Sequence, residues 1–249
     1  RCQFAPGSFR RIIAVSQQVK SDIMDHYGVP ATRITVLYNG VDDERFHPSV
    51  RQKWRRETRA RWSIPDDAPV VLFVGSGFLR KGLDRLLAIW GRPCLRKTYL
   101  LIVGEDAAQG HYRARARSAG DDRIVFAGRQ EAVERYYGAA DVLALPSIQE
   151  AFGNVVLEAL ACGLPVVVAR AAGAAEILRG RAACGLVNDA GAPDELTDKL
   201  ITQMARSAAP GHCEELRKSV EDYSWRSHFT KLDATLSEVW AEKKRERVS

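Results

Sequence analysis

The chain has 249 residues, of which 46% are hydrophobic and 27% charged, a composition typical of globular proteins and unlike that of disordered or fibrous ones. No apolar run approaches the ~18 residues that a membrane-spanning helix requires, and no secretory signal is visible. Thirty-seven Lys and Arg against 31 Asp and Glu leave a net charge of +6, which suits an anionic partner.

The start of the chain and its cysteines give two further expectations. The sequence opens at Arg1 and not at a methionine, so we expect a fragment or a processed product. Five widely spaced cysteines form no C-x-x-C pair and no cluster with histidine. They therefore predict reduced thiols in the cytoplasm and no metal site.

The first 40 residues predict the end of one domain. Residues 11–16 have the pattern of a short buried strand, and Ser16 is placed to cap the helix that follows. Gly28 ends that helix, and a second strand is predicted over residues 34–37. We divide the chain into the end of an N-terminal domain, a linker, a nucleotide-sugar-binding Rossmann-like domain and a C-terminal helix, at residues 1–40, 41–50, 51–225 and 226–249.

A basic segment over residues 51–62 carries Trp54 and Trp62 among six basic side chains. Such a segment could contact an anionic membrane surface. The alternative, which we favour, is a solvated helix whose tryptophans pack inward.

From residue 69 onward, apolar strands alternate with helices. Strands are predicted at Val70–Gly75, Tyr99–Val103, Ile124–Ala127, Val142–Leu145, Val166–Ala169 and Gly185–Val187. Helical segments are predicted at Gly82–Trp90, Tyr112–Ala119, Val133–Tyr137, Asn154–Ala161 and Ala174–Leu178. This alternation predicts an α/β fold with a doubly wound parallel sheet, which binds ligands at the carboxyl ends of its strands.

The loop after the first of these strands, Gly75 to Gly82, delivers two adjacent cations, Arg80 and Lys81. It is neither a dinucleotide fingerprint nor a P-loop, because Arg80 and Lys81 break both patterns. Cations at a helix N-terminus oppose the helix dipole, so an anionic ligand explains them better than an ordinary basic helix start. We expect Gly75 and Gly77 to shape the turn, and the two cations to hold a diphosphate.

Glu150 and Glu158 flank the start of an apolar helix near Gly153. Free helix amides attract phosphate oxygens, while carboxylates accept hydrogen bonds from sugar hydroxyls. Apolar neighbours crowd Glu158, so its carboxylate needs a definite partner. Gly153 lets a ligand approach the backbone. A nucleotide sugar would satisfy all of these groups.

Other polar clusters give weaker signals. Arg129 and Gln130 follow another strand and could place main-chain groups against a nucleobase. Asp42-Asp43 and Asp121-Asp122 predict turns and not metal ligands. No histidine pair has metal-ligand spacing and no Ser/His/Asp arrangement stands out, so we expect no metal and no cofactor.

Three motifs together resemble the family 4 retaining glycosyltransferases, whose GT-B fold consists of two Rossmann-like domains. They are Arg80-Lys81-Gly82, the E-x7-E element from Glu150 to Glu158, and Gly163-Leu164-Pro165-Val166-Val167. The resemblance covers roughly residues 11–225. Residues 75–85 and 126–129 are most similar to the lipopolysaccharide core glucosyltransferases.

The resemblance implies a role for each site residue. Glu158 would bind the nucleotide ribose, Glu150 would lie near the donor sugar, and Arg80 and Lys81 would grip the diphosphate. The amides that would contact sugar hydroxyls and phosphate are those around Phe152, Gly153, Asn154 and Val155. It also implies sugar transfer with retention and commonly without a metal, by front-face substitution in which the leaving phosphate helps deprotonate the acceptor.

Two departures from the family pattern limit these expectations. The run Gly173-Ala174-Ala175-Glu176 lacks the usual Gly-Gly and Pro-Glu, and most of the acceptor-side domain has no counterpart, including its glycine-rich loop and histidine. UDP-glucose is our leading donor, with a glycan or lipid-linked acceptor such as lipopolysaccharide core. We expect a cytoplasmic protein with peripheral contact at the inner face of the membrane. This stretch alone should bind donor but transfer little.

Two other functions stay open: a GT-B nucleotide-sugar epimerase and a non-catalytic nucleotide-binding module. An epimerase would alter the nucleotide sugar without an acceptor, whereas a module would bind nucleotide without ever gaining transferase activity. Nucleic-acid binding has the least support, because the basic residues lack the expected motifs and interleaved aromatic residues.

Overall fold

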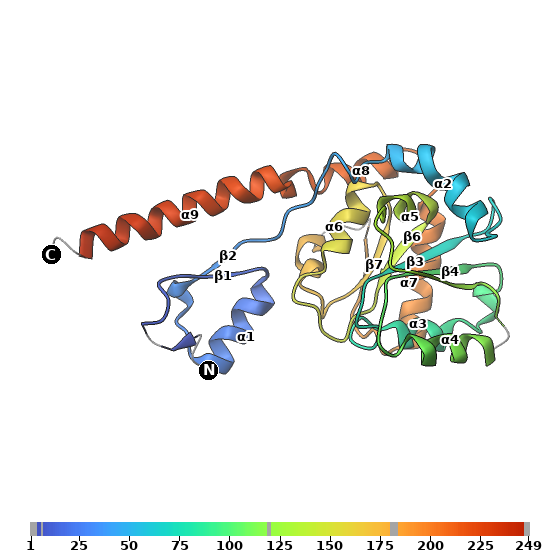
Figure 1. The fold of residues 1–249 in the computed structure, drawn as a ribbon, viewed down its shortest axis with the longest axis horizontal. Coiled ribbons are helices and arrows are strands. Elements are labelled where there is room, and N and C mark those ends of the chain that lie inside the picture. The colour runs from blue at the N-terminus through green and yellow to red at the C-terminus, as the bar shows by residue number, and fades with distance from the viewer. Residues whose placement is uncertain (1–3, 6, 119–120, 180–183, 247–249) are drawn as a thin grey trace.

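The computed structural model describes residues 4–5, 7–118, 121–179 and 184–246. They form two lobes of unequal size, joined by an extended connection and by a long C-terminal helix (Figure 1). The smaller lobe contains β1 (Ile12–Ala14), α1 (Gln17–Tyr27) and β2 (Ile34–Val36), and its two strands are parallel. The larger lobe carries a six-stranded sheet.

Local capping explains the boundaries of α1. The side chain of Ser16 accepts a hydrogen bond from the Val19 amide, as predicted, and Gly28 ends the helix in the left-handed conformation. Ile23 of the helix packs with Ala14 and Ile34 of the two strands in a small core of their own.

The six strands of the larger lobe are all parallel. They are β3 (Val70–Val74), β4 (Tyr99–Val103), β5 (Ile124–Gly128), β6 (Val142–Leu145), β7 (Val166–Ala169) and β8 (Gly185–Val187). Their spatial order is β5-β4-β3-β6-β7-β8. The chain therefore starts in the middle of the sheet, builds outward to β5 and returns to continue at β6. This is the doubly wound order, with its topological switch point between β3 and β6.

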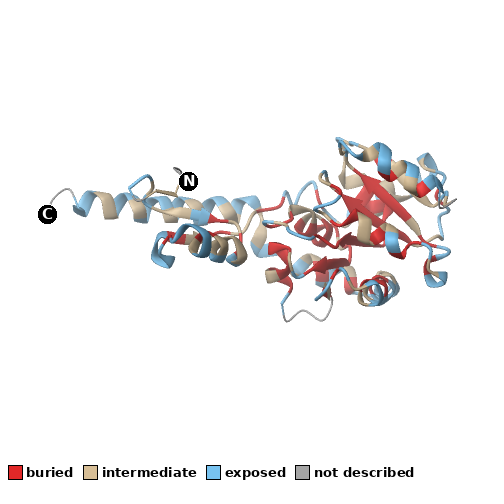
Figure 2. Cartoon of the chain, turned by 90° about the horizontal axis from the view of Figure 1, so that it is seen from below, coloured by how far each residue is buried: buried red, intermediate tan, exposed pale blue. Residues whose placement is uncertain are grey.

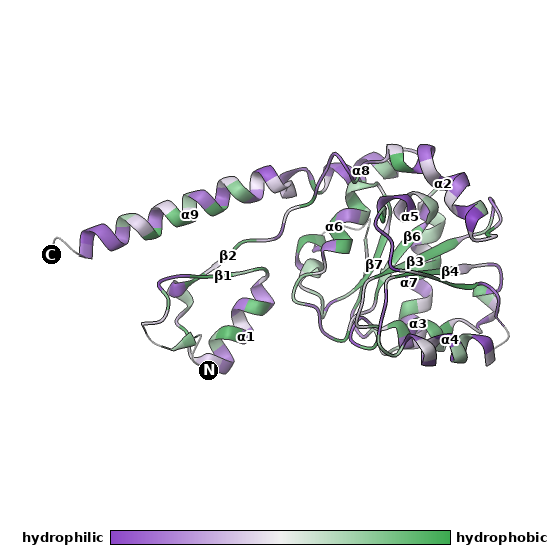
Figure 3. Cartoon of the chain, in the orientation of Figure 1, coloured by the Kyte–Doolittle hydropathy of each residue, from purple (hydrophilic) through white to green (hydrophobic). Residues whose placement is uncertain are grey.

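Helices cover both faces of this sheet, as the alternating pattern predicts (Figure 1). One face packs against α2 (Ser49–Arg61), α5 (Glu134–Ala139), α6 (Asn154–Ala161) and α8 (His212–Lys218). The other packs against α3 (Leu83–Ile89), α4 (Gln109–Ser118) and α7 (Pro193–Arg206). Buried residues concentrate in this lobe (Figure 2), and its strands are the most hydrophobic part of the chain (Figure 3).

Most predicted elements occur close to their expected bounds, and two differ. Residues 173–178 form a 3₁₀-helix, η4 (Gly173–Leu178), where a helix was predicted over 174–178. Helix α2 begins at Ser49, inside the predicted linker, because Val50 is buried against the sheet domain. The predicted helix end at Ala119 and the chain end at 247–249 lie outside the described residues.

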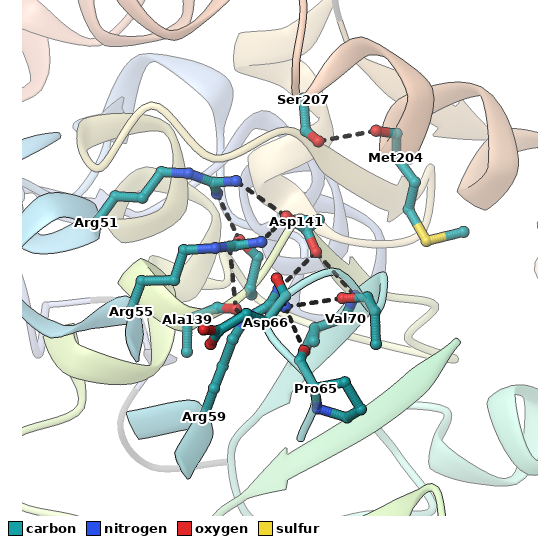
Figure 4. A network of polar contacts seen from close by, with 12 residues as sticks. Arg51, Arg55, Arg59, Pro65, Asp66, Val70, Ala139, Asp141, Met204 and Ser207 are labelled. Carbon is teal, nitrogen blue, oxygen red and sulfur yellow. Dashed lines mark hydrogen bonds and ion pairs between the residues drawn. The ribbon is translucent and has the colours of Figure 1, made fainter. Parts of the chain in front are cut away.

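Three arginines fasten α2 to the amino-terminal edge of the sheet. Arg51, Arg55 and Arg59 lie on one face of α2, and each donates to the carboxylate of Asp141, at 3.0, 2.9 and 2.8 Å (Figure 4). Asp141 also accepts from the Val70 amide at the start of β3. Burial acts to raise the pKa of Asp141, but the charges of the arginines outweigh it and hold that pKa below its usual range.

The tryptophans of the basic segment pack inward, as the favoured alternative predicts. Trp54 and Trp62 are half-buried against the core below α2. The guanidinium of Arg135 lies 3.8 Å from the centre of the Trp54 ring, and the Trp62 indole donates to the Tyr136 hydroxyl at 3.3 Å. Among the described residues, no helix combines the length and the apolar character that crossing a bilayer requires.

Two chain segments run side by side between the lobes. Val41 follows β2, and it exchanges backbone hydrogen bonds with Tyr223 and Trp225 at 2.8 and 3.1 Å. Helix α9 (Trp225–Glu246) then extends along the smaller lobe (Figure 1). Arg11 binds Glu242 of α9 at 2.8 Å. The paired segments and α9 thus attach the smaller lobe to the sheet domain.

Candidate functional site

The loops that follow β3 and β6 meet at the topological switch point. The amide of Ile148 donates to the carbonyl of Arg80 at 2.8 Å, and Arg85 donates to the carbonyl of Pro146 at 3.0 Å. A side chain at Gly82 would place its Cβ 2.0 Å from the Pro146 oxygen, and Gly82 has a φ of 81°. Only glycine fits there, so this residue sets the close approach of the two loops.

Both predicted cations converge on the first carboxylate of the acidic pair. Lys81 Nζ and Arg80 Nη1 each lie 3.2 Å from Glu150 Oε2. The side chains of Lys81 and Glu150 are 12% exposed, whereas that of Arg80 is 50% exposed. Lys81 is thus held inside the site, while Arg80 lies at its rim. Gly75 makes room for Lys81, because a Cβ at this position would lie 2.8 Å from the lysine chain.

Glycines bring the ends of three neighbouring strands together. The Gly75 amide donates to Val103 at the end of β4, and the Gly104 amide donates to Gly128 at the end of β5, both at 2.8 Å. A Cβ at Gly104 would lie 2.1 Å from the Gly75 oxygen. Residues 128–130 therefore share the edge that carries Lys81.

The residues predicted to face a base differ in their contacts. Gln130 donates to the carbonyl of Ala127 at 2.6 Å, while Arg129 is exposed. Gly77 lies beside Arg80 with a φ of 73°. Asp106, which sequence reasoning missed, accepts from the amides of Phe78 and Ala108 at 2.9 and 2.8 Å. These bonds hold its pKa below the usual range. The sequence feature that could have identified Asp106 is a carboxylate two residues after Gly104, the glycine that follows β4.

Helix α6 begins at this site with its first amides uncapped by any side chain. Gly153 precedes it with a φ of 99°, and a Cβ there would lie 2.9 Å from Leu145 and 3.3 Å from Glu150. Of the other residues predicted here, Phe152 is buried beneath the loop, and Val155 packs against the core. The amide end of α6 thus points toward the loop that carries Glu150, as the sequence predicts.

Glu158 is half-buried on α6 and has the definite partner that its apolar neighbours demand. The hydroxyl of Tyr137 donates to Glu158 Oε2 at 2.5 Å. Burial raises the pKa of Glu158, while the Tyr137 hydrogen bond and the charges of Arg45 and Lys81 oppose that rise. The charge of Lys81 therefore reaches both carboxylates of the pair.

The smaller lobe contacts the same loop directly. Ser16 donates to the carbonyl of Ala151 at 2.8 Å, and Asn39 donates to the side-chain oxygen of Asn154 at 2.7 Å. Asn154, predicted to offer its amide to a ligand, thus has its side chain engaged across the lobes. Nothing in the sequence pattern around Ser16 indicated this second partner.

Glu176, in the run that departs from the family pattern, binds the smaller lobe. It accepts from the amides of Gln17 and Gln18 at 2.8 and 2.9 Å, and from the Tyr38 hydroxyl at 2.9 Å. Two of these donors are the first amides of α1, so Glu176 complements the positive end of that helix.

The predicted aspartate pairs make turns. Asp42 accepts from the Arg45 amide and Asp121 from the Arg123 amide, both at 3.0 Å. No three His, Cys, Asp or Glu side chains of the described part of the chain lie together as a metal site would require. The expectation that no metal is needed stays a prediction.

A cavity of about 580 Å³ lies at the opposite, amino-terminal edge of the sheet. Arg51, Arg55 and Lys97 line it together with Met204 of α7. None of the predicted site residues borders it, so the loops at the carboxyl edge remain the candidate site.

Family comparisons agree with this architecture. The family model described as "Glycosyl transferases group 1" matches residues 68–206, and the one described as "Glycosyltransferase Family 4" matches residues 3–45. The first covers the sheet domain with both site loops, and the second covers the smaller lobe.

The curated relatives that match are longer than this chain. A D-inositol 3-phosphate glycosyltransferase of Streptomyces bingchenggensis is 30% identical over 251 residues, which cover 95% of this chain and 53% of that protein. The lipopolysaccharide glucosyltransferase WaaG of Escherichia coli is 32% identical over 192 residues, covering 75% of this chain and 50% of that protein. The chain thus spans about half the length of the relatives it matches.

Solved structures share the fold. A crystal structure of WaaG superposes with a TM-score of 0.80 at 25% identity, covering 94% of this chain and 65% of the other. A structure of Anabaena HepE in complex with UDP and glucose superposes with a TM-score of 0.77 at 23% identity, covering 92% and 63%.

Proposed function

The chain belongs to the group 1 glycosyl transferases and contains the C-terminal sheet domain of the GT-B fold with the end of its N-terminal domain, and from this premise we propose that it is the donor-binding part of a retaining hexosyltransferase. The observation that carries the proposal is the convergence of Arg80 and Lys81 on Glu150 beside the amide end of α6. Cations and helix amides suit a diphosphate, and carboxylates suit sugar hydroxyls.

Each group has a distinct task in the proposed reaction. Lys81, held inside the site, neutralises the negative charge that grows on the diphosphate as the glycosidic bond breaks. Arg80 lies at the rim and closes on the outer phosphate oxygens. Glu150 orients the donor sugar, and Glu158 accepts from the ribose. The leaving phosphate helps deprotonate the acceptor, so no protein base is required.

We favour UDP-glucose as the donor. The resemblance of the first site loop to lipopolysaccharide glucosyltransferases and the likeness to HepE, whose structure contains UDP and glucose, both support this choice. Isothermal titration of the 249-residue chain with UDP-glucose, UDP-GlcNAc and GDP-mannose tests it. We expect binding, tightest for UDP-glucose. Heat changes at the level of buffer for all three nucleotides would overturn the proposed function.

The proposed acceptor is a glycan or a lipid-linked sugar, and the proposed location is the cytoplasmic face of a membrane. Sedimentation with anionic vesicles at low salt tests the second point. We expect part of the protein in the pellet, released by salt because screening weakens attraction to a net charge of +6. Complete recovery in the supernatant would exclude surface binding by this chain.

A further inference from the structure

Tyr137 is a buried tyrosine whose hydroxyl makes its hydrogen bond to one carboxylate oxygen of Glu158. We propose that Tyr137 is a positioning residue, which fixes the Glu158 carboxylate so that its second oxygen accepts from the ribose diol of a nucleoside diphosphate. The inference rests on the proposed function and deepens it, by naming the residue that orients the proposed ribose-binding carboxylate.

The packing of Tyr137 makes it a rigid support. Its side chain is 1% exposed on α5, and its ring meets that of Phe46 edge-on with centres 5.6 Å apart. The hydroxyl therefore has one fixed position, 2.5 Å from Glu158 Oε2. The terminal torsion of a glutamate is otherwise broad, so this bond selects one orientation of the carboxylate.

The other oxygen of Glu158 is available to a ligand. Oε1 makes no hydrogen bond to any residue that the structure describes, and Glu158 is only half-buried. An ionised carboxylate accepts hydrogen bonds and donates none. The free oxygen therefore suits hydroxyl donors, and a site built for such donors discriminates against analogues that lack them.

The same hydrogen bond helps to keep Glu158 ionised. Burial raises the pKa of Glu158, and three groups oppose that rise: the hydrogen bond from the Tyr137 hydroxyl on α5, the charge of Arg45 after β2 and the charge of Lys81 after β3. Cys162 directly follows the last residue of α6, and burial and the charge of Glu158 raise its pKa, so it stays a neutral thiol. Removing the Tyr137 hydroxyl removes a hydrogen bond that stabilises the ionised carboxylate, so the pKa of Glu158 rises further.

Tyr137→Phe tests the proposal, because it removes the hydroxyl and keeps the ring packed. UDP and 2′,3′-dideoxy-UDP are titrated into both proteins at several values over about pH 5–9. We expect wild type to prefer UDP by about 10–100-fold, the range for a hydrogen bond to a charged group. In the variant the preference should fall to a few-fold at every pH, because the carboxylate is no longer held in one orientation, and it should fall further at acidic pH, where the carboxyl protonates.

Two further variants separate positioning from packing. Tyr136→Phe is the matched control, because Tyr136 is also buried on α5 but its hydroxyl accepts from Trp62 at 3.3 Å. It should keep the wild-type preference at every pH. Glu158→Gln should lower the preference for UDP over 2′,3′-dideoxy-UDP equally at every pH, because glutamine does not ionise. The double variant with Tyr137→Phe should show no pH dependence either.

The outcomes distinguish this inference from the proposed function. If wild type binds neither nucleotide, the proposed function fails and the inference fails with it. If wild type prefers UDP and Tyr137→Phe behaves like wild type at every pH, only the inference is overturned. A loss in Tyr137→Phe that is equal for both nucleotides and independent of pH would also overturn it, since that result indicates packing alone.

Discussion

Lys81 Nζ and Glu150 Oε2 lie 3.2 Å apart, although one follows β3 and the other follows β6. They meet because β3 and β6 are neighbours in the sheet, with Val71 paired to Val142. Both strands end at the switch point, so their loops face each other there. The pair is therefore a direct consequence of the strand order.

The first prediction concerns Lys81 in a protein that includes the acceptor-side domain. Lys81→Gln removes a cation from the place where, in the proposed reaction, the leaving diphosphate gains charge. We expect turnover to fall about 10²–10³-fold, or roughly 3–4 kcal/mol of transition-state stabilisation. Lys97→Gln is the matched control, because Lys97 is exposed at the opposite edge of the sheet. Turnover of Lys81→Gln within threefold of wild type would exclude the proposed role.

The second prediction concerns Asp141. Replacing it by Asn leaves the fully buried guanidinium of Arg59 without its carboxylate. We expect the free energy of unfolding at neutral pH to fall by about 3–5 kcal/mol, as for other broken buried ion pairs. Denaturant titration measures this loss. Asp67→Asn is the control, since Asp67 is exposed and its substitution should change stability by less than about 0.5 kcal/mol.

The difference in the free energy of unfolding between wild type and Asp141→Asn should decrease as the pH falls. The folded state holds the pKa of Asp141 below that of an unfolded aspartate, which is about 3.9. Its stabilisation is therefore complete above that value and is lost as pH falls toward the folded-state pKa. The gap between wild type and Asp141→Asn should narrow in acid. A gap that widens below about pH 4 would contradict the ionised network.

The third prediction compares two glycines. Gly82→Ala forces a Cβ against Pro146 in a left-handed conformation, so we expect a loss of about 2–4 kcal/mol in thermal or denaturant unfolding. Gly110→Ala is the control, for which we expect a gain in stability and not a loss. Gly110 is exposed in α4 with open space around its Cα, so alanine should stabilise by about 0.5–1 kcal/mol. Equal stabilities for the two variants would show that the loops tolerate a wider separation.

The fourth prediction concerns Glu176 and Tyr38. Burial and the hydrogen bond and charge of Glu176 raise the pKa of Tyr38 to about 12. Glu176→Gln removes the charge, so that pKa should fall toward the ordinary value of about 10. Ultraviolet titration of tyrosinate measures it, with Tyr38→Phe to assign the signal. Tyr112, whose pKa burial and Asp84 raise, should titrate unchanged in the same protein.

This titration also has a consequence for stability. Because the folded state raises the pKa of Tyr38, its contribution is complete below about pH 10 and is lost as pH rises toward about 12. Wild type should therefore lose more stability than Glu176→Gln over this range. Identical alkaline profiles for the two proteins would contradict the Glu176–Tyr38 bond.

Sequence patterns predicted the parallel sheet well, because its strands are continuous apolar runs bounded by glycines and turns. Strands such as Val142–Leu145 and helix Asn154–Ala161 occur at their predicted bounds. The order of the strands could not be predicted from these patterns, since neighbouring strands such as β3 and β6 are far apart in the chain. The edge on which Lys81 and Glu150 lie was predictable, but their pairing was not.

The partners of individual side chains were the least predictable part of the site. The burial of Glu158 indicated that it needs a partner, but no spacing rule connects it to Tyr137 on another helix. The same holds for Ser16: its capping of α1 is local and was predicted, whereas its bond to Ala151 depends on how the lobes meet. Local rules identify such residues, and tertiary packing selects their partners.

The bond from Ser16 to Ala151 makes the loop of Glu150 a mechanical link between the lobes. Glu150 immediately precedes Ala151, and the paired segments at Val41 and Tyr223 lie where both connections cross. A rotation of the smaller lobe away from the sheet domain would therefore either displace the backbone next to Glu150 or break this hydrogen bond. A separation of the lobes and a change in the shape of the candidate site would therefore be coupled.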